Sequence, residues 1–461
     1  MKRRLLSFLG IAAWLLFVPA GLSQSKPEPG QAGSVAAALE DFKFTKIDLE
    51  LLVKVKQFEK YLEEKGYVYH DAEVIAYVAR VGGAVLPQET PEHVEWRFRV
   101  LRDPMANAFA LPNGSIYVHT GLLALLENEA QLASVLAHEA RHVLGHHTYK
   151  QNRSQRKKMV AIHILSAAGA AAGAAGGWGS VASAVISLIP VMVVGTIYGY
   201  SRELEREADV KAFTALNEAE YSTEEMPITF QLLQSSHEVE LEGEPIFYRS
   251  HPRLQERIAY ITQMVNTIRP KVRHPMVEAE RYVAATEKTV RYNAGLDIQS
   301  GRARTALAAS KRLVRTGPKA ENFLALGDAI AALGPMTPEP TDEEKSSKGK
   351  GETRKMLSKM TPQEYEAALW AKPGAAKSWE ENRTKAEEAY RKALELDANL
   401  ATAYRGLGDV FTTDKRPGEA VEAYRKYLEM APESRDRVQI NRKIQELEKG
   451  LPKPGTSNAN P

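Results

Sequence analysis

The chain of 461 residues contains no cysteine, and this absence excludes disulfide bonds, thiolate metal ligands and cysteine nucleophiles together. An excess of charge of one sign is also lacking, because 61 Lys and Arg residues nearly balance 58 Asp and Glu residues and leave a net charge of +3. A chain with so little net charge offers no electrostatic basis for binding nucleic acid. Any metal ion must therefore be held by His, Asp or Glu side chains.

The N-terminal apolar run, residues 5–18, follows Lys2, Arg3 and Arg4 and is shorter than the roughly 20 residues of a membrane span. Small residues follow in the stretch PAGLSQS. The pattern predicts a secretory signal peptide over residues 1–23, cleaved after Ser23, with an uncleaved membrane anchor as the alternative. We expect an exported protein with a mobile Pro/Gly-rich leader over residues 24–40.

The stretch that follows alternates between helical and strand patterns. A helix is predicted from Asp41 to about Lys65, with a packing face that comprises Leu49, Leu52, Val53 and Lys56. The alternation in VEWRFRVL, residues 94–101, predicts a half-buried strand. NAFALPNGSIYVHTG predicts a hairpin with its turn at residues 112–114 and its second strand at 115–119. A long helix follows, so the fold class is α+β and mainly helical.

LASVLAHEARHVLGHH, residues 132–147, lies on that long helix, and Asn128 with Gln131 resembles a helix cap at its start. Residues four apart on a helix point the same way, so His138 and His142 converge on one point in space. Two neutral imidazoles there can hold Zn²⁺ while Glu139 takes a proton from the attacking water. The alternative is a surface helix that carries these residues by chance, and a zinc site would need a third protein ligand from elsewhere.

GYSRELEREADVKA, residues 199–212, offers Glu205, Glu207 and Asp209 on a strongly helical, charged stretch. Taken alone, these acids are typical of a solvated helix face with ion pairs between successive turns. Glu205 and Asp209 lie four apart on one face. One of them can therefore bind the metal while the other accepts a hydrogen bond from a ligand histidine.

Four sequence blocks occur in the order of a known peptidase family: NAFALPNGSIYVHTGLL, HEARH, SRELEREADVKA and RSHPRLQERI. Over roughly residues 40–265 the chain resembles the zinc endopeptidases that include the CAAX prenyl protease, HtpX and the periplasmic β-barrel assembly-enhancing protease. The resemblance implies a gluzincin-like metallopeptidase domain over residues 41–265. Its single Zn²⁺ would be held by His138, His142 and Glu205, with Glu139 as the catalytic base and Asp209 as a supporting carboxylate.

The resemblance also implies roles outside this group, whereas Glu207 does not match a ligand position. Arg257 would either steady the oxyanion formed on peptide attack or pair with Asp209. His251 would lie near the metal as a regulatory fourth ligand that keeps the enzyme latent, the alternative being a loop histidine beside a proline. The substrate would add as a strand to an edge strand formed by Ser115, Ile116, Tyr117 and Val118, the alternative being a plain structural strand.

Three other histidines are not expected to bind zinc. His146 and His147 follow Gly145 and are expected to decorate the helix end, and His163 lies in an apolar run. That run belongs to residues 159–201, which contain no Asp, Glu, Lys or Arg. Its Gly-rich stretches, Trp178 and Pro190 favour apolar helices or loops beside the active site, with peripheral membrane contact, over a membrane hairpin.

The C-terminal region repeats with a period of 34 residues, as the pairs Ala386/Ala420, Ala389/Ala423, Tyr390/Tyr424 and Leu394/Leu428 show. This period predicts an all-α domain of tetratricopeptide repeats over residues 379–450, with a degenerate copy in the helical region 266–334 marked by Leu326, Gly327 and Asp328. A charged linker or loop is predicted over residues 335–378 and a disordered tail over 451–461. Stacked helix pairs form a protein-binding groove, unless they only cap the peptidase domain.

These features together predict an exported zinc endopeptidase. The resemblance implies a periplasmic role in the quality control of outer-membrane clients, with unfolded or misassembled proteins as substrates and the envelope assembly machinery as partner of the repeats. The alternatives are a periplasmic chaperone or assembly scaffold with latent proteolysis, and a membrane-embedded processing protease. We expect no nucleic-acid partner.

Overall fold

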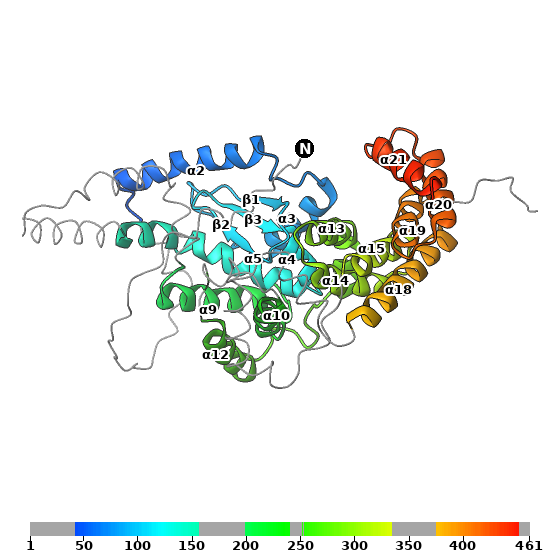
Figure 1. The fold of residues 1–461 in the computed structure, drawn as a ribbon. Helices are drawn as coiled ribbons and strands as arrows, with labels where there is room; N and C mark the ends of the chain where they lie inside the picture. Colours follow the sequence, from blue (N-terminus) through cyan, green and yellow to red (C-terminus); the bar gives the residue numbers. More distant parts are fainter. Residues whose placement is uncertain (1–41, 156–198, 240–250, 252, 334–374, 451–461) are drawn as a thin grey trace, which may run out of the picture. The chain divides into compact units, whose positions relative to one another are not determined.

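The computed structural model describes residues 42–155, 199–239, 251, 253–333 and 375–450 (Figure 1). The chain divides into two compact units, residues 1–43 and 44–461, and every element below belongs to the second. The predicted signal peptide and leader, most of the segments 159–201 and 335–378, and the tail lie outside the described residues. None of the described helices combines the length and the apolar character that a membrane span requires.

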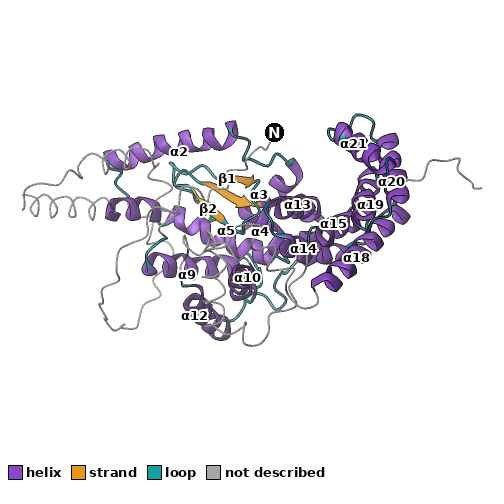
Figure 2. Ribbon diagram, in the orientation of Figure 1, coloured by secondary structure: helices purple, strands orange, loops and turns teal. Residues whose placement is uncertain are grey.

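A three-stranded sheet, drawn in orange in Figure 2, consists of β1 (Arg97–Leu101), β2 (Ala108–Ala110) and β3 (Ser115–His119). The strand order is β1-β3-β2 (Figure 1). β3 is parallel to β1 and antiparallel to β2. The predicted hairpin of β2 and β3 is therefore confirmed. Gly114 closes its turn with a φ of +95°, and a Cβ there would lie 2.6 Å from the Glu95 carbonyl oxygen, so glycine is required.

β3 is the central strand of this sheet, so the prediction that Ser115, Ile116, Tyr117 and Val118 form an edge strand is wrong. The backbone of β3 is engaged on both sides by its neighbours, and no free edge remains there for a peptide. Its side chains are buried on both faces. Every second side chain of β3 points to the face covered by α2 (Lys46–Glu64). On that face the Ser115 hydroxyl donates a hydrogen bond of 2.5 Å to the carboxylate of Glu59.

α2 and α5 (Glu129–Leu144) cover opposite faces of the sheet (Figure 1). The face predicted for α2 is wrong, because Leu49 and Val53 are 54% and 58% exposed whereas Leu51 and Val55 are buried. The buried Asp48 explains the rotation of the helix. It caps the helix start together with Thr45 and accepts hydrogen bonds from Arg153, which turns its own side of the helix inward.

α5 is the buried centre of the region around the sheet. Its first turn is capped as predicted, because the Asn128 side chain accepts from the Gln131 N–H over 2.9 Å. Nearly every position along the helix is buried. Around α5 lie α3 (Ala72–Ala84), α4 (Thr120–Leu125), α9 (Arg202–Glu218), α10 (Glu225–Val239) and α12 (Leu254–Thr267).

Glu129 anchors the first turn of α5. The fully buried carboxylate accepts hydrogen bonds from Tyr77, Arg80, Tyr221 and Arg281. Burial raises the pKa of Glu129, but the arginines and tyrosines lower it more, so that it falls to about 2. The network ties α5 to α3 and to α13 (Ala279–Gln299), and it fixes the position of the helix that carries the HEARH motif.

The C-terminal helices form a second apolar core. They are α14 (Ala303–Thr316), α15 (Ala320–Ala331), α18 (Ala375–Leu396), α19 (Ala401–Thr413), α20 (Pro417–Met430) and α21 (Arg437–Glu448). Tyr390 covers Gly327 and donates to Asp328, and Tyr424 covers Gly408 and donates to Asp409. The same contact thus occurs in the repeats and in the predicted degenerate copy.

Candidate metal centre

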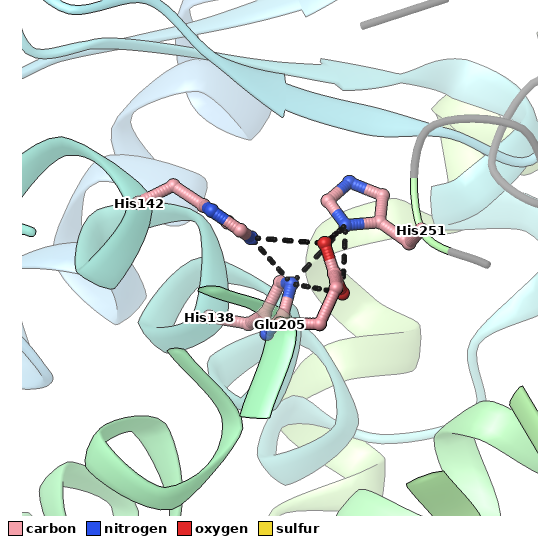
Figure 3. A group of neighbouring side chains, drawn as sticks. All are labelled: His138, His142, Glu205 and His251. Atoms are coloured by element: carbon pink, nitrogen blue, oxygen red, sulfur yellow. Dashed lines mark hydrogen bonds and ion pairs between the residues drawn. The ribbon is translucent and has the colours of Figure 1, made fainter. Parts of the chain in front are cut away.

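Three separate parts of the chain bring four potential metal ligands together. α5 contributes His138 and His142, α9 contributes Glu205, and His251 lies three residues before α12. Figure 3 shows the four side chains converging on a common space. All four are at most 3% exposed. Side chains of this polarity are rarely buried together unless they share a partner.

The distances within this group fit a tetrahedral zinc site. The Nε2 atoms of His138 and His142 lie 2.9 Å apart, and each lies 3.6 Å from a carboxylate oxygen of Glu205. Nδ1 of His251 lies 3.2 Å from His138 Nε2 and 3.1 Å from Glu205 Oε1. Zinc–ligand bonds of about 2.0–2.1 Å arranged as a tetrahedron place neighbouring ligand atoms about 3.3 Å apart. The donor set therefore matches zinc in both chemistry and spacing.

The three imidazoles are held in the neutral form that binds metal. Burial lowers the pKa of His142 well below its ordinary value, and the neighbouring histidines lower it further. Burial and the charge of Arg257 lower the pKa of His138, and they lower that of His251 to about 3. A neutral ring leaves one nitrogen with a lone pair for the ion.

The charge balance of the cluster favours a divalent cation. Three buried carboxylates, Glu139, Glu205 and Asp209, face a single buried guanidinium, that of Arg257. Burial raises the pKa of Glu205 to about 7. Burial together with the charge of Glu205 raises the pKa of Glu139 well above its usual range. A bound divalent cation would neutralise the two uncompensated negative charges and return both carboxylates to their ionised form.

Asp209 supports the first histidine of the motif from behind. Its Oδ1 lies 2.8 Å from His138 Nδ1, which keeps the proton on Nδ1 and directs Nε2 toward the other ligands. Burial raises the pKa of Asp209, but Arg257 and His138 lower it more, so the group stays ionised. Tyr260 also donates a hydrogen bond to Asp209.

Arg257 forms a bidentate pair with Asp209, with distances of 2.8 Å from Nε and 2.7 Å from Nη2. Its Nη1 lies 2.8 Å from Oε2 of Glu205. Of the two roles predicted for Arg257, the pairing with Asp209 is the one that this geometry shows. A contribution to oxyanion stabilisation stays a prediction.

Glu139 lies beside the ligand group but contributes no ligand atom to it. Its carboxylate is fully buried and lies beside the backbone N–H of Ala110 in β2, which lowers its pKa against the effect of burial. Its Oε1 lies 3.3 Å from Nε2 of His251. His251 therefore contacts the proposed base through one nitrogen and the ligand group through the other.

Two aromatic residues at the site were not found from the sequence. His147 is fully buried and contacts His142, so the prediction that it decorates the helix end is wrong. Tyr200 stacks on the ring of His142 with centroids 3.9 Å apart and bonds to Thr148. Gly145, the residue that follows α5, was the sequence feature that could have indicated a buried His147, because a glycine without a Cβ permits the close approach of a following side chain. Glu207 stands outside the ligand group, as expected.

Comparison with known proteins connects this geometry to a family. Residues 72–265 match the sequence profile of Peptidase family M48, and residues 401–434 match that of the tetratricopeptide repeat. The beta-barrel assembly-enhancing protease of Escherichia coli is 24% identical over 230 residues, or 49% of this chain and 45% of that protein. A Vibrio cholerae protein named "Putative beta-barrel assembly-enhancing protease" is 28% identical over 254 residues, which cover 54% of this chain and 50% of that protein.

A mitochondrial protein is also similar to this chain. The mitochondrial metalloendopeptidase OMA1 of Schizosaccharomyces pombe is 26% identical over 187 residues, which cover 41% of this chain and 52% of that one. The chain spans about half the length of the curated relatives it matches. The four potential ligands and Glu139 all fall within the matched range. Residues 72–265 of this chain thus carry the sequence profile of peptidase family M48, and a tetratricopeptide repeat lies near its C-terminus.

Proposed function

We propose that this protein is a zinc-dependent endopeptidase. The observation that carries the proposal is the buried group formed by His138, His142 and Glu205, whose ligand atoms have the mutual spacing of a zinc tetrahedron and lie beside the carboxylate of Glu139. The match of residues 72–265 to a peptidase family supports the same reaction. Each chain would hold one ion, since the described residues provide a single group of this kind.

In this proposal each side chain has one task. His138 and His142 would hold zinc through Nε2, and Glu205 would hold it through its carboxylate. When bound, zinc supplies Lewis acidity that polarises the peptide carbonyl. Asp209 keeps the proton of His138 on Nδ1. Glu139 takes a proton from the attacking water and delivers it to the leaving amine, for which its enclosed position beside the ligands suits it.

The free edge of β2 suits the binding of an extended substrate. Within the described residues β2 pairs only with β3, and Ala110 of β2 already contacts Glu139 through its N–H. A peptide added along this edge would pass directly beside the proposed base. Recognition through backbone hydrogen bonds would give broad sequence specificity, as the degradation of unfolded proteins requires.

His251 is the proposed latch of this site. Its Nδ1 stands at the fourth corner of the ligand group, and its Nε2 faces Glu139. In this position the ring occupies the space that water and the substrate carbonyl need. Replacing His251 with Ala should raise the peptidase activity of the full chain while zinc stays bound. An activity that falls in proportion to zinc content would instead make His251 a structural ligand.

The experiment that tests the proposed function measures the hydrolysis of casein by the full chain, with and without a chelator and with zinc restored. Glu139→Gln should lower the hydrolysis rate by about 10²–10⁴-fold, because the base contributes about that much, while zinc content stays unchanged. The matched control is Glu203→Gln on α9, an exposed residue that should leave the rate at the wild-type value. Zinc-loaded wild-type protein that leaves several unfolded substrates intact would refute the proposal.

The biological setting is part of the proposal. Two of the relatives are named as β-barrel assembly-enhancing proteases, which supports a role for this chain in the quality control of outer-membrane proteins in the periplasm. The repeat region, with its protein-binding architecture, would recruit the envelope assembly machinery. Export is tested by fractionating cells that express the full chain.

A scaffold with latent proteolysis is the second candidate, and the closed position of His251 favours it. The two functions separate in cells that lack the protein. Glu139→Gln restores growth under envelope stress if the protein is a scaffold and fails to do so if it is a peptidase.

A further inference from the structure

His147 makes a contact that neither the motif nor the family match assigns. We infer that His147, backed by Glu207, is a positioning residue that fixes the tautomer and orientation of His142. The inference rests on the proposed function, because it gives His142 the role of a zinc ligand. The inference also gives a role to Glu207, which is not one of the ligands and instead supports His147.

The argument begins with two nitrogens. Nδ1 of His142 and Nδ1 of His147 lie 2.9 Å apart, and both rings are buried. Two imidazole nitrogens at that distance need one proton between them. Nε2 of His142 faces the ligand group and must present a lone pair there, so the proton belongs on its Nδ1. His147 Nδ1 therefore accepts this hydrogen bond.

The accepting role of His147 fixes its own tautomer. A neutral ring whose Nδ1 accepts carries its proton on Nε2. That Nε2 lies 3.5 Å from Oε2 of Glu207, a carboxylate on α9 that is held in place by Lys211 at 2.6 Å. The ion-pair contact of Glu207 with His147 and the hydrogen bond of His147 with His142 thus link a carboxylate to Nδ1 of His142, the nitrogen opposite the one that faces the ligand group.

The backbone at the end of α5 is shaped to bring His147 there. α5 ends at Leu144, and His146 adopts a left-handed conformation with a φ of +54° that non-glycine residues rarely use. This reversal folds the ring of His147 back over Gly145, where a Cβ would lie 2.3 Å from its Nε2. An unfavourable backbone conformation and a required glycine at consecutive positions both serve the placement of one side chain.

α9 then supports both histidines of the motif. Asp209 contacts Nδ1 of His138 directly at 2.8 Å, and Glu207 reaches Nδ1 of His142 through His147. Tyr200 stacks on the face of His142 and holds the plane of the ring. α9 thus carries Glu205, the third proposed ligand, together with Asp209 and Glu207, the carboxylates that support His138 and His142.

The test measures the zinc affinity of the full chain by competition with a chromogenic chelator, and the ligand field from the absorption spectrum of the cobalt-substituted protein. His147→Leu should weaken zinc binding by about 10–100-fold and change the cobalt spectrum, because the acceptor for His142 is lost. His147→Asn should stay within about threefold of wild type, because the amide Oδ1 takes the place of Nδ1 as acceptor.

Two further variants separate positioning from folding. Gly145→Ala removes no polar atom, but its Cβ displaces the His147 ring, so it should weaken zinc binding like His147→Leu. His146→Asn is the matched control and should bind zinc like the wild type. Asparagine tolerates the left-handed conformation of this position, and the ring of His146 stacks on His93 rather than on His142. Wild-type affinity in both His147→Leu and Gly145→Ala would overturn the inference. Equal losses in His147→Leu and His147→Asn would overturn it too, since they would show that only shape matters.

The outcomes for the inference and for the proposed function are distinguishable. If wild-type protein binds zinc but cleaves nothing, the endopeptidase proposal is refuted. The inference on His147 is then still decided by comparing the zinc affinities of the wild type and the variants. Wild-type protein that binds no divalent ion refutes both.

Discussion

Removing the bound cation should destabilise the peptidase domain, and Glu205→Gln should abolish that response while making the ion-free protein more stable. The predicted gain in stability of ion-free Glu205→Gln is the opposite of the usual effect, because replacing a buried, paired residue normally destabilises a protein. It follows from the burial of a carboxylate whose neighbours include two further carboxylates and one guanidinium.

The magnitude comes from the pKa of Glu205, which is about 7 in the folded protein against an ordinary value of 4.5. A folded-state pKa above the unfolded one means that the cost of ionisation is absent below about pH 4.5 and fully present above about pH 7. At pH 8 the difference amounts to about 3 kcal/mol of stability lost by the ion-free wild type. Glu205→Gln recovers up to that amount.

The cation acts in the opposite direction in the wild type. An ion present at about 1,000 times its dissociation constant stabilises the folded state by about 4 kcal/mol. For a domain of this size each kcal/mol corresponds to roughly 2–4 °C, so a chelator should lower the Tm by about 8–16 °C. The Tm of Glu205→Gln should not respond to the chelator.

Scanning calorimetry of the full chain at pH 8 and pH 5, with zinc or with chelator, measures these shifts. The control is Glu203→Gln, an exposed position on the same helix, which should behave as wild type under all four conditions. Ion-free Glu205→Gln that melts below ion-free wild type at pH 8 would refute the reasoning. So would a gain of equal size at pH 5, where most of the ionisation cost is absent.

Three further predictions concern the support of the site and the two cores. Asp209→Asn should weaken zinc binding by about 10–100-fold in a chelator titration, because His138 loses the carboxylate that fixes its proton. The pKa of Glu129, about 2, lies below its ordinary value, so its stabilising contribution is present above about pH 4.5 and is lost as the pH falls toward 2. In urea titrations at several pH values over this range, the free energy of unfolding of Glu129→Gln should accordingly change less with pH than that of the wild type. An equal pH dependence in the two proteins would count against the network. Gly408→Ala should destabilise the repeats by about 1–3 kcal/mol in thermal unfolding, because its Cβ would lie 2.5 Å from the ring of Tyr424, whereas Gly418→Ala, with open space around it, should not.

Part of the candidate site could be predicted from the sequence because helix geometry is local. His138 and His142 must point the same way wherever they lie on one helix, and Glu139 must stand beside them. The approach of Glu205 and His251 depends on how α9 and the segment before α12 pack against α5. The sequence offered Glu205 as one of three acids on a helix, the family resemblance selected it and pointed to His251, and the distances of both from the motif came from the packing.

The repeats were equally accessible from the sequence. A period of 34 residues places Tyr390 and Tyr424 in equivalent positions, and both cover glycines and donate to aspartates in the structure. The face of α2 was not accessible in the same way. Leu49 and Val53 follow a helical period, yet the buried pairing of Asp48 with Arg153, far away in the chain, decides which side faces inward.

The sequence by itself determined the pair of converging histidines, the carboxylate of Glu139 beside them, the hairpin turn at Gly114 and the repeats, because each depends on backbone geometry over a few neighbouring residues or on an internal period. Tertiary structure alone decided that β3 is central rather than at the edge, since strand order depends on which distant strand pairs with it. It also decided that His147 turns inward to His142, because that requires both the reversal at His146 and a carboxylate presented by another helix.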